Sequence, residues 1–415
     1  MVLTGSNPNL LNKLLDSMNK EFRMKDLGKL HYFLGIQATF HDKGLFLSQQ
    51  KYAEDLLKVA GMFDCAPMPT PLPEQLNQVP HQKQLFSNPT YFRSLAGKLQ
   101  YLTLTRPDIQ FAVNFVCQKM HEPKMSDFHL LKRILRYVKG TTAMGISFNK
   151  NTDFTLRAYS DNSHANCKDT RRSIAGFCTF LGNNIISWSS KRQPTVSKSS
   201  TEAEYRALSD TTSEPVWINN MLKDLRIPQM EPPELYGDNL SSIYLAANPI
   251  FHNRTKHFET HYHYVRERVA LGAMVVKHVP AHQQLADIFT KPLPQGPFSS
   301  LRHKLGVVVP PTPSLQGSMK EKPNSQLKPN FETEDSKVDQ TKPNNTQSTK
   351  PSKPNTRQEM RRWSPENKKK DKAEESLYLQ AIANAEVAGC HKALQIETKN
   401  GFDALTLLSE DDICH

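Results

Sequence analysis

Residues 154–190 read FTLRAYSDNSHANCKDTRRSIAGFCTFLGNNIISWSS, and this stretch decides the fold expected for the middle of the chain. Its first part, FTLRAYSD, alternates like a strand and ends in Asp161. Its second part, SIAGFCTFLGNNIISWSS, holds two strand-like runs joined at Gly182, Asn183 and Asn184, a turn typical of a β-hairpin. The region therefore begins with three consecutive strands.

Helix and strand patterns alternate after the hairpin. A helix is predicted from SSTEAEYRALSD, where Ser199 to Thr201 can cap it and the glutamates lie early, near the positive end of the helix dipole. PELYG is predicted to be a short strand, NLSSIYLAA a short helix, TKHFETHYHYVRERVAL a longer helix and AMVVKHVP the last strand. HQQLADIFTK is predicted to be the final helix. Pro215 is expected to kink or break the first helix, because proline removes a backbone hydrogen bond.

Four acids occupy informative positions in this pattern. Asp161 ends the first strand, Glu204 lies in the first turns of a helix, Asp238 ends the fourth strand and Asp287 lies in the last predicted helix. Their order alone is also compatible with unrelated surface acids. If they converge, their mutual repulsion requires cations, and oxygen-only ligands select Mg²⁺ or Mn²⁺. Two such ions can activate a water and stabilise the departing oxygen in phosphodiester cleavage.

Residues 1–148 alternate short strand-like runs with amphipathic helices. KLHYFLGIQATF is strand-like, and FHLLKRILRYVKG is a helix that ends near Gly140. Its apolar stripe comprises Leu130, Leu131, Ile134, Leu135 and Val138. The cations beside that stripe form either a solvated face or a phosphate-facing surface.

The remaining sequence differs in composition. Residues 310–375 are rich in Pro, Lys and Asn, which predicts a disordered linker, and residues 376–415 look like a short helical and acidic tail of unknown role. The net charge of +12 favours a polyanionic partner. The scattered cysteines form no CxxC pair, which suits a reducing compartment. Without a long apolar run or a leader, we expect an intracellular protein, cytoplasmic or nuclear, that is not secreted and has no membrane partner.

The middle of the chain resembles the ribonuclease H domain of copia-type (Pseudoviridae-like) retrotransposon Pol polyproteins. The matching segments are SKSSTEAEYRAL, YGDNLSSIYLAANP, RTKHFE and HVPAHQQLADIFTKPLP, together with the opening stretch. MKDLGKLHYFLGIQ, LFLSQQKYAEDLLKVAGM, LAGKLQYLTLTRPDIQFAVN and LLKRILRYVKGT resemble the segment after the reverse transcriptase palm of that family, most closely in plant-type elements.

The resemblance implies an α/β fold, with a ribonuclease H-like mixed five-stranded sheet flanked by helices over residues 153–294. It also implies an α+β palm-end and thumb or connection remnant over residues 1–148. The family's acids fall on Asp161, Glu204, Asp238 and Asp287, with Glu204 rather than Glu202 matching the glutamate of its A-E-Y. These would bind two Mg²⁺ or Mn²⁺ ions and cleave the RNA strand of an RNA–DNA hybrid, leaving a 3′-hydroxyl. The rest of the retroelement polyprotein is the other expected partner.

Two departures from the family pattern bear on activity. SDNSHANC stands where the family shows S-D-x-D-W-A-G-C, so Ser163, His164 and Asn166 replace Asp, Trp and Gly. MVLTGSNPNLL resembles the segment directly after the YVDD polymerase motif of that family, and the motif itself is absent, so we expect no DNA polymerase activity in this chain. The alternative function is an inactive relic, or a host-fused protein that only binds nucleic acid.

Further residues are candidates for contact with nucleic acid or for catalysis. Three basic pairs are as compatible with surface solubility as with contact to the substrate backbone: Arg171 with Arg172, Lys191 with Arg192, and Arg254 with Lys256. VPAH resembles the histidine-bearing loop of retroviral ribonucleases H, in which the histidine assists product release or proton transfer. His282 is therefore a candidate assisting residue.

Overall fold

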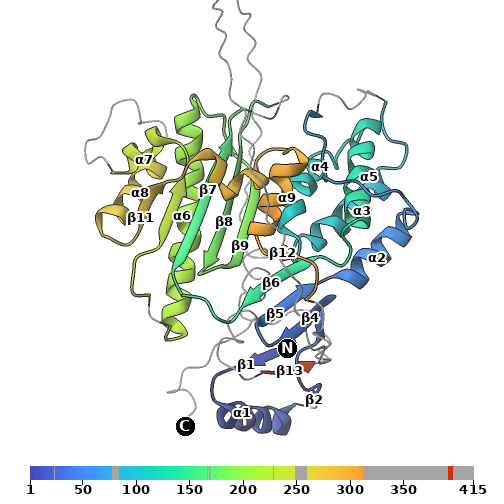
Figure 1. The fold of residues 1–415 in the computed structure, drawn as a ribbon, viewed down its shortest axis with the longest axis vertical. Coiled ribbons are helices and arrows are strands. Elements are labelled where there is room, and N and C mark those ends of the chain that lie inside the picture. The colour runs from blue at the N-terminus through green and yellow to red at the C-terminus, as the bar shows by residue number, and fades with distance from the viewer. Residues whose placement is uncertain are drawn as a thin grey trace, which may run out of the picture. The chain divides into compact units, whose positions relative to one another are not determined.

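The computed structural model describes residues 1–22, 24–76, 84–165, 167, 170–227, 229–247, 259–311 and 391–395. They belong to one compact unit, formed by Met1–Pro311 and Asp371–His415 (Figure 1). The other unit, Thr312–Lys370, lies outside the described residues, and so does the expected tail over residues 376–415 apart from His391–Gln395. The disordered linker expected over residues 310–375 therefore stays a prediction.

An antiparallel five-stranded sheet, in the order β12-β6-β5-β4-β3, organises the first part of the chain. Its strands are β3 (Tyr32–Phe33), β4 (Ile36–His41), β5 (Gly44–Ser48), β6 (Gly145–Asn149) and β12 (Val307–Val308). The helices of this part are α2 (Gln50–Val59), α3 (Pro89–Leu102), η2 (Pro107–Ile109), α4 (Gln110–Cys117) and α5 (Met125–Lys139).

Two predictions for this part have different outcomes. The stripe of α5 is buried as expected, from Leu130 at 6% exposed to Val138 at 0%, and Gly140 caps the helix. KLHYFLGIQATF is not one strand. Leu34 and Gly35 adopt left-handed φ angles of 45° and 73°, so the chain reverses there and β3 pairs antiparallel with β4.

A short sheet in the order β1-β13-β2 lies at the N-terminus. It comprises β1 (Val2–Thr4), β2 (Lys25–Asp26) and β13 (His391–Gln395), and α1 (Pro8–Glu21) lies between β1 and β2 in sequence. The strand β13 falls within the tail for which the sequence predicts a helical and acidic segment, so a strand is present there that the sequence did not predict.

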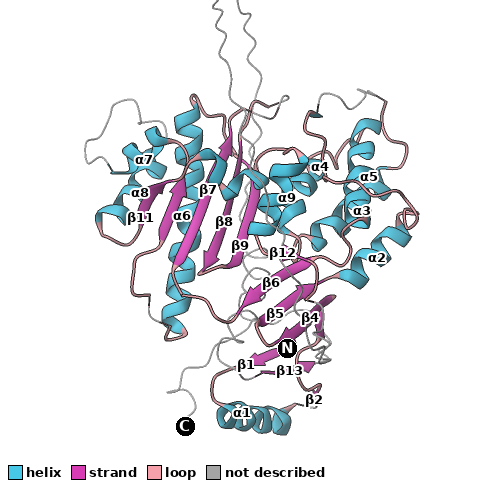
Figure 2. Cartoon of the chain, in the orientation of Figure 1, coloured by secondary structure: helices cyan, strands magenta, loops and turns pink. Residues whose placement is uncertain are grey.

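The second sheet is mixed, with the order β11-β10-β7-β8-β9 (Figure 2). Its strands are β7 (Leu156–Ser163), β8 (Ile174–Leu181), β9 (Asn184–Arg192), β10 (Glu234–Gly237) and β11 (Val275–His278). β10 runs parallel to β7 and β11, and β8 runs antiparallel to β7 and β9. The hairpin turn lies where expected, between β8 and β9.

Helices cover both faces of the second sheet. Those after β9 are α6 (Ser200–Asp224), α7 (Leu240–Ala247), α8 (Glu259–Ala270), η4 (Ala281–Gln283), η5 (Leu285–Phe289) and α9 (Gln295–Lys304). In β7 the Ser160 hydroxyl accepts a hydrogen bond from Thr211 of α6, whereas the carboxylate of the next residue, Asp161, accepts one from Thr290 after η5. Because successive strand residues point to opposite faces, α6 and η5 lie on opposite sides. The predicted fold class is confirmed.

Three local expectations are wrong. HQQLADIFTK forms the two short 3₁₀ helices η4 and η5, because Gln284 between them is extended, with ψ 106°. Pro215 does not break its helix in two, since α6 runs from Ser200 to Asp224 with buried Pro215 inside it, whereas the expected kink stays a prediction. β7 continues two residues beyond Asp161, to Ser163.

The segment after the second sheet returns to the first. β12 pairs antiparallel with β6, and the hydrophobic core that contains Leu131 and Phe180 also contains Phe298 and Leu301 of α9. No helix in the described part of the chain is long and apolar enough to cross a membrane.

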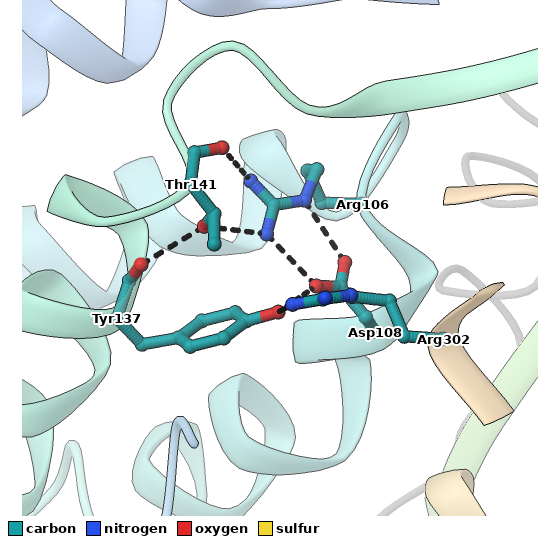
Figure 3. A network of polar contacts seen from close by, with 5 residues as sticks. All are labelled: Arg106, Asp108, Tyr137, Thr141 and Arg302. Carbon is teal, nitrogen blue, oxygen red and sulfur yellow. Dashed lines mark hydrogen bonds and ion pairs between the residues drawn. The ribbon is translucent and has the colours of Figure 1, made fainter. Parts of the chain in front are cut away.

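A buried polar network lies beside this returning segment (Figure 3). The guanidinium of Arg106, 1% exposed, donates to both Asp108 oxygens at 2.9 and 2.8 Å and to the Thr141 carbonyl at 2.8 Å. The Tyr137 hydroxyl donates to Asp108 and accepts from Arg302 of α9 at 3.2 Å. Burial alone would raise the pKa of Asp108, but Arg106 and Tyr137 outweigh it and hold that pKa below its ordinary value.

Candidate active site

Three carboxylates meet near the carboxyl ends of β7 and β10. Asp161, Glu204 and Asp238 each place an oxygen within 4.8 Å of the others. The parallel pairing of β10 with β7 aligns Tyr236 with Tyr159, whose rings stack at 5.0 Å. Asp238 and Asp161 each follow two residues later, so both strands deliver an acid to the same edge of the sheet.

The start of α6 supplies Glu204. The Ser199 hydroxyl caps the helix by accepting from the Glu202 backbone N–H at 3.1 Å. The Glu202 carboxylate is buried, accepts from the Lys198 N–H at 2.9 Å and forms an ion pair with Arg206 at 2.9 Å. Glu202 therefore stabilises the helix start, whereas Glu204 faces the other acids.

Asp287 is connected to this cluster through a lysine. The ammonium of Lys291 lies 2.7 Å from Asp287 Oδ1 and 3.7 Å from Asp161 Oδ2, and the Thr290 hydroxyl donates to the same Asp161 oxygen. Asp287 itself is not within the 4.8 Å group that the other three acids form. The sequence interpretation missed Thr290 and Lys291. Their only sequence signal is the four-residue step from Asp287 to Lys291.

Two further residues that the sequence interpretation missed hold this segment in place. Buried Gln284 donates from its side chain to the Ser160 carbonyl at 2.9 Å and accepts from Ala286 N–H. Gly176 of β8 pairs with Asp161, and a Cβ added there would lie 2.6 Å from Phe289 Cβ and 2.8 Å from Thr290 Cγ2. Only glycine allows η5 to approach the sheet this closely.

Burial, followed by repulsion between neighbouring acids, raises the pKa values of three carboxyl groups at this site. Burial, and then repulsion from Asp161 and Asp238, raises the pKa of Glu204 to about 9. Burial and repulsion from Asp161 also raise the pKa of Asp238, and raise that of Asp287 to about 7. Burial would lower the pKa of Lys291, but attraction to Asp161 and Asp287 outweighs it and raises that pKa.

The donor set fits a hard divalent cation. All donors are carboxylate oxygens, which suits Mg²⁺ or Mn²⁺ better than softer metals. Several carboxylates this close repel one another unless positive charge lies among them. The ammonium of Lys291 already supplies one such charge beside Asp161 and Asp287. Asp161, Glu204 and Asp238 could therefore hold one cation, with Asp287 available on the Asp161 side.

The predicted basic residues are partly placed. Ile174 at the start of β8 pairs with Ser163 and with Arg192, so Arg192 and Lys191 lie at the same edge of the sheet as Asp161. Arg171 and Arg172 directly precede β8, and the loop there closes through Arg171 N–H donating to the Cys167 carbonyl at 2.7 Å. Arg254 and Lys256 lie outside the described residues.

His282 lies in η4 and is exposed. Its Nε2 lies 3.2 Å from the side-chain nitrogen of Gln283, and among the described residues it is not grouped with the three acids. Its assisting role stays a prediction.

Known proteins share large parts of this sequence. Residues 1–74 match the family described as reverse transcriptase (RNA-dependent DNA polymerase). The chain is 44% identical over 313 residues to a retrovirus-related Pol polyprotein from transposon RE1 of Arabidopsis thaliana. The aligned region covers 75% of this chain and 21% of that polyprotein. It is also 59% identical over 217 residues to an uncharacterised mitochondrial protein of the same plant. That aligned region covers 52% of this chain and 90% of the mitochondrial protein.

One solved structure with detectable likeness is the crystal structure of LC11-RNase H1 in complex with RNA/DNA hybrid. It has 18% identity and a TM-score of 0.25, and covers 33% of this chain and 94% of that one. The fold class rests instead on the strand order and directions of the second sheet. The chain spans about a fifth of the length of the RE1 polyprotein.

Proposed function

The chain belongs to the family of retrovirus-related Pol polyproteins of copia-type plant retrotransposons, and we propose that its second sheet forms a ribonuclease H. This domain, residues 153–294, would cleave the RNA strand of an RNA–DNA hybrid by metal-assisted phosphodiester hydrolysis. Residues 1–148 would be the end of a reverse transcriptase. The rest of the polyprotein is the expected partner.

One observation carries the proposal. Asp161, Glu204 and Asp238 come from three separate elements and converge within 4.8 Å at one edge of a mixed sheet. Like charges are costly to bring together, so such convergence favours a site that binds cations over a chance surface cluster. The membership of the chain in a Pol family supports hydrolysis of a nucleic acid as the reaction.

Each residue has a distinct task in this proposal. Asp161, Glu204 and Asp238 would hold one or both Mg²⁺ ions, and Asp287 would complete the second site. When bound, such ions supply an activated water and charge compensation at the departing oxygen. Thr290 fixes the orientation of the Asp161 carboxylate by donating to it. Glu204 and Asp287 must release protons to act as ligands, because their pKa values are about 9 and about 7.

The substrate would lie along the basic edge of the sheet. Arg171 and Arg172 precede β8, and Lys191 and Arg192 are the last residues of β9, at the edge where Asp161 lies. These four side chains would contact backbone phosphates. Contacts to 2′-hydroxyls across the shallow minor groove would distinguish the RNA strand. Arg254 and Lys256 are proposed for the same role.

The test is cleavage of a labelled RNA–DNA hybrid by the purified full chain, with Mg²⁺ and with a chelator. We expect cleavage only with the metal, and a loss of about 100-fold or more in Asp161→Asn and Asp238→Asn. Asp224→Asn is the matched control, since Asp224 is exposed at the far end of α6. Undiminished cleavage in Asp161→Asn and Asp238→Asn would show that these acids do not form the active site.

A second candidate is an inactive relic that binds hybrids without cutting them. It is favoured by the altered SDNSHANC stretch, where His164 is exposed in the turn after β7 and Ala165 has a left-handed φ of 51°. Binding of the hybrid without cleavage in Mg²⁺ or Mn²⁺ would support this candidate over the enzyme.

A further inference from the structure

Lys291 places a positive charge inside the acidic cluster. Its ammonium lies between carboxylates of two elements, 2.7 Å from Asp287 Oδ1 and 3.7 Å from Asp161 Oδ2. The Asp161 side chain is 3% exposed, whereas that of Lys291 is 39% exposed. One end of the cluster is therefore neutralised by the chain itself, at the surface where a cation would enter.

The segment that leads into this lysine is held against the sheet. The preceding residue, Thr290, is fully buried and donates its hydroxyl to Asp161. η5 is in turn pressed against Gly176 and is preceded by Gln284, whose side chain is anchored on the Ser160 carbonyl. Lys291 thus differs from an ordinary surface lysine, whose ion pairs contribute little because the side chain moves freely.

The charge acts on every acid of the site. Besides its ion pairs with Asp161 and Asp287, Lys291 lowers the pKa values of Glu204 and Asp238 relative to those they would have without it. Its attraction therefore replaces part of what a divalent cation would supply to the same oxygens. A lysine ammonium and a metal ion cannot both occupy the short space beside Asp287 Oδ1.

We propose that Lys291 is a built-in counter-cation that competes with a divalent metal ion for the oxygens of Asp161 and Asp287. The inference rests on the proposed function, because it presupposes that the cluster binds metal. Metal binding on this side requires the ammonium to leave, and the 39% exposure of its side chain gives it a path towards solvent. Lys291 would then set how much metal is needed to fill the site, as a positioning residue rather than a catalytic one.

The experiment is Mn²⁺ binding to the full chain, measured by titration calorimetry without nucleic acid. We expect Lys291→Met to bind Mn²⁺ at least about tenfold more tightly than the wild type, because the competing charge is gone. Lys291→Arg, which keeps the charge, should stay within about threefold of the wild type. The matched control is Lys223→Met, which removes an exposed charge near the far end of α6 and should change nothing.

The outcomes separate the two proposals. If the wild type binds Mn²⁺, Asp161→Asn does not, and Lys291→Met binds no more tightly than the wild type, the counter-cation role is overturned and the metal site stands. If neither the wild type nor Lys291→Met binds Mn²⁺ while circular dichroism shows both folded, both proposals fail. Thermal unfolding gives a second readout. The rise in melting temperature caused by Mn²⁺ should be larger for Lys291→Met than for Lys291→Arg.

Discussion

Two glutamates two positions apart in α6 have opposite electrostatic surroundings. Glu202 is buried but paired with Arg206 and the Lys198 N–H, so its charge is compensated. Glu204 is half-buried near Asp161 and Asp238, forms no ion pair with a cation among the described residues, and its pKa rises from 4.5 to about 9. Residue type and sequence spacing do not distinguish the two, because the difference comes from what each carboxylate meets across the sheet.

The raised pKa of Glu204 predicts a pH-dependent stability in the absence of metal. The unfolded chain releases this proton near pH 4.5 and the folded protein near pH 9, so stability falls as pH rises between these values. Glu204→Gln should remove the part of that slope that Glu204 contributes and be more stable than the wild type by at least about 1 kcal/mol at pH 9. Near pH 4.5 the two should become alike.

Urea unfolding with a chelator across this pH range measures the effect. Glu202→Gln is the comparison, because losing its ion pair should lower the free energy of unfolding by about 1–3 kcal/mol. Equal destabilisation by both substitutions at pH 9 would show that Glu204 is not held in a repulsive cluster.

At the scale of elements, the close packing of η5 against the second sheet positions the residues on the Asp287 side of the site. η5 carries Asp287 and leads into Thr290 and Lys291, and it can reach Asp161 only because Gly176 leaves space on β8. The two 3₁₀ helices replace the predicted α-helix because the Gln284 side chain forms two hydrogen bonds. It donates to the Ser160 carbonyl of β7 and accepts from the Ala286 N–H. Contacts across the sheet thus override the local helical pattern.

Gly176→Ala tests this arrangement. The added methyl would overlap Phe289 and Thr290, so η5 must shift and carry Asp287 and Lys291 with it. We expect hybrid cleavage to fall about tenfold or more, since small displacements of catalytic groups are costly. The free energy of unfolding should fall by about 1–3 kcal/mol.

The control for this substitution is Gly97→Ala in α3, where an added Cβ meets nothing within 4 Å. It should leave cleavage unchanged and stabilise the helix by about 0.5–1 kcal/mol. Unchanged cleavage in Gly176→Ala would show that the position of η5 does not matter to the reaction.

At the scale of the whole described unit, the chain closes on itself after the second sheet. β12 adds to the first sheet beside β6, and Arg302 of α9 reaches the hydroxyl of Tyr137 in the buried network (Figure 3). Distant segments are thereby joined, as the separation of 165 residues between Tyr137 and Arg302 shows. The first sheet is complete only with β12, which comes from the C-terminal side of the second sheet.

Arg302→Met should therefore lower the free energy of unfolding by about 1–3 kcal/mol, because the buried Tyr137–Asp108 pair loses a charged donor. Lys304→Met, an exposed charge removal in the same helix, should change it by no more than about 0.5 kcal/mol. Trp188 fluorescence during urea unfolding is a suitable probe, since its indole donates to the Thr103 carbonyl of the first part. Equal effects of the two substitutions would mean that the network does not depend on α9.

The sequence by itself determined the strands of the second sheet, the cap of α6 at Ser199 and the stripe of α5. These follow from side-chain periodicity and local hydrogen bonds, which act within a few residues. It also supplied Asp161, Glu204, Asp238 and Asp287 as candidate acids, through strand ends and family resemblance. The first three lie together in the structure.

Only the tertiary structure decided what surrounds those acids. No local pattern assigns a role to Thr290, Gln284 or Gly176, and only the four-residue step from Asp287 indicates Lys291. Each of the four acquires its role from a contact with β7 or η5 across the sheet. The same holds for the unbroken helix at Pro215 and the return of β12 to β6. Local periodicity selects elements, whereas burial and charge between distant segments select which faces meet. The balance of charge in the site therefore depends on those contacts between distant segments.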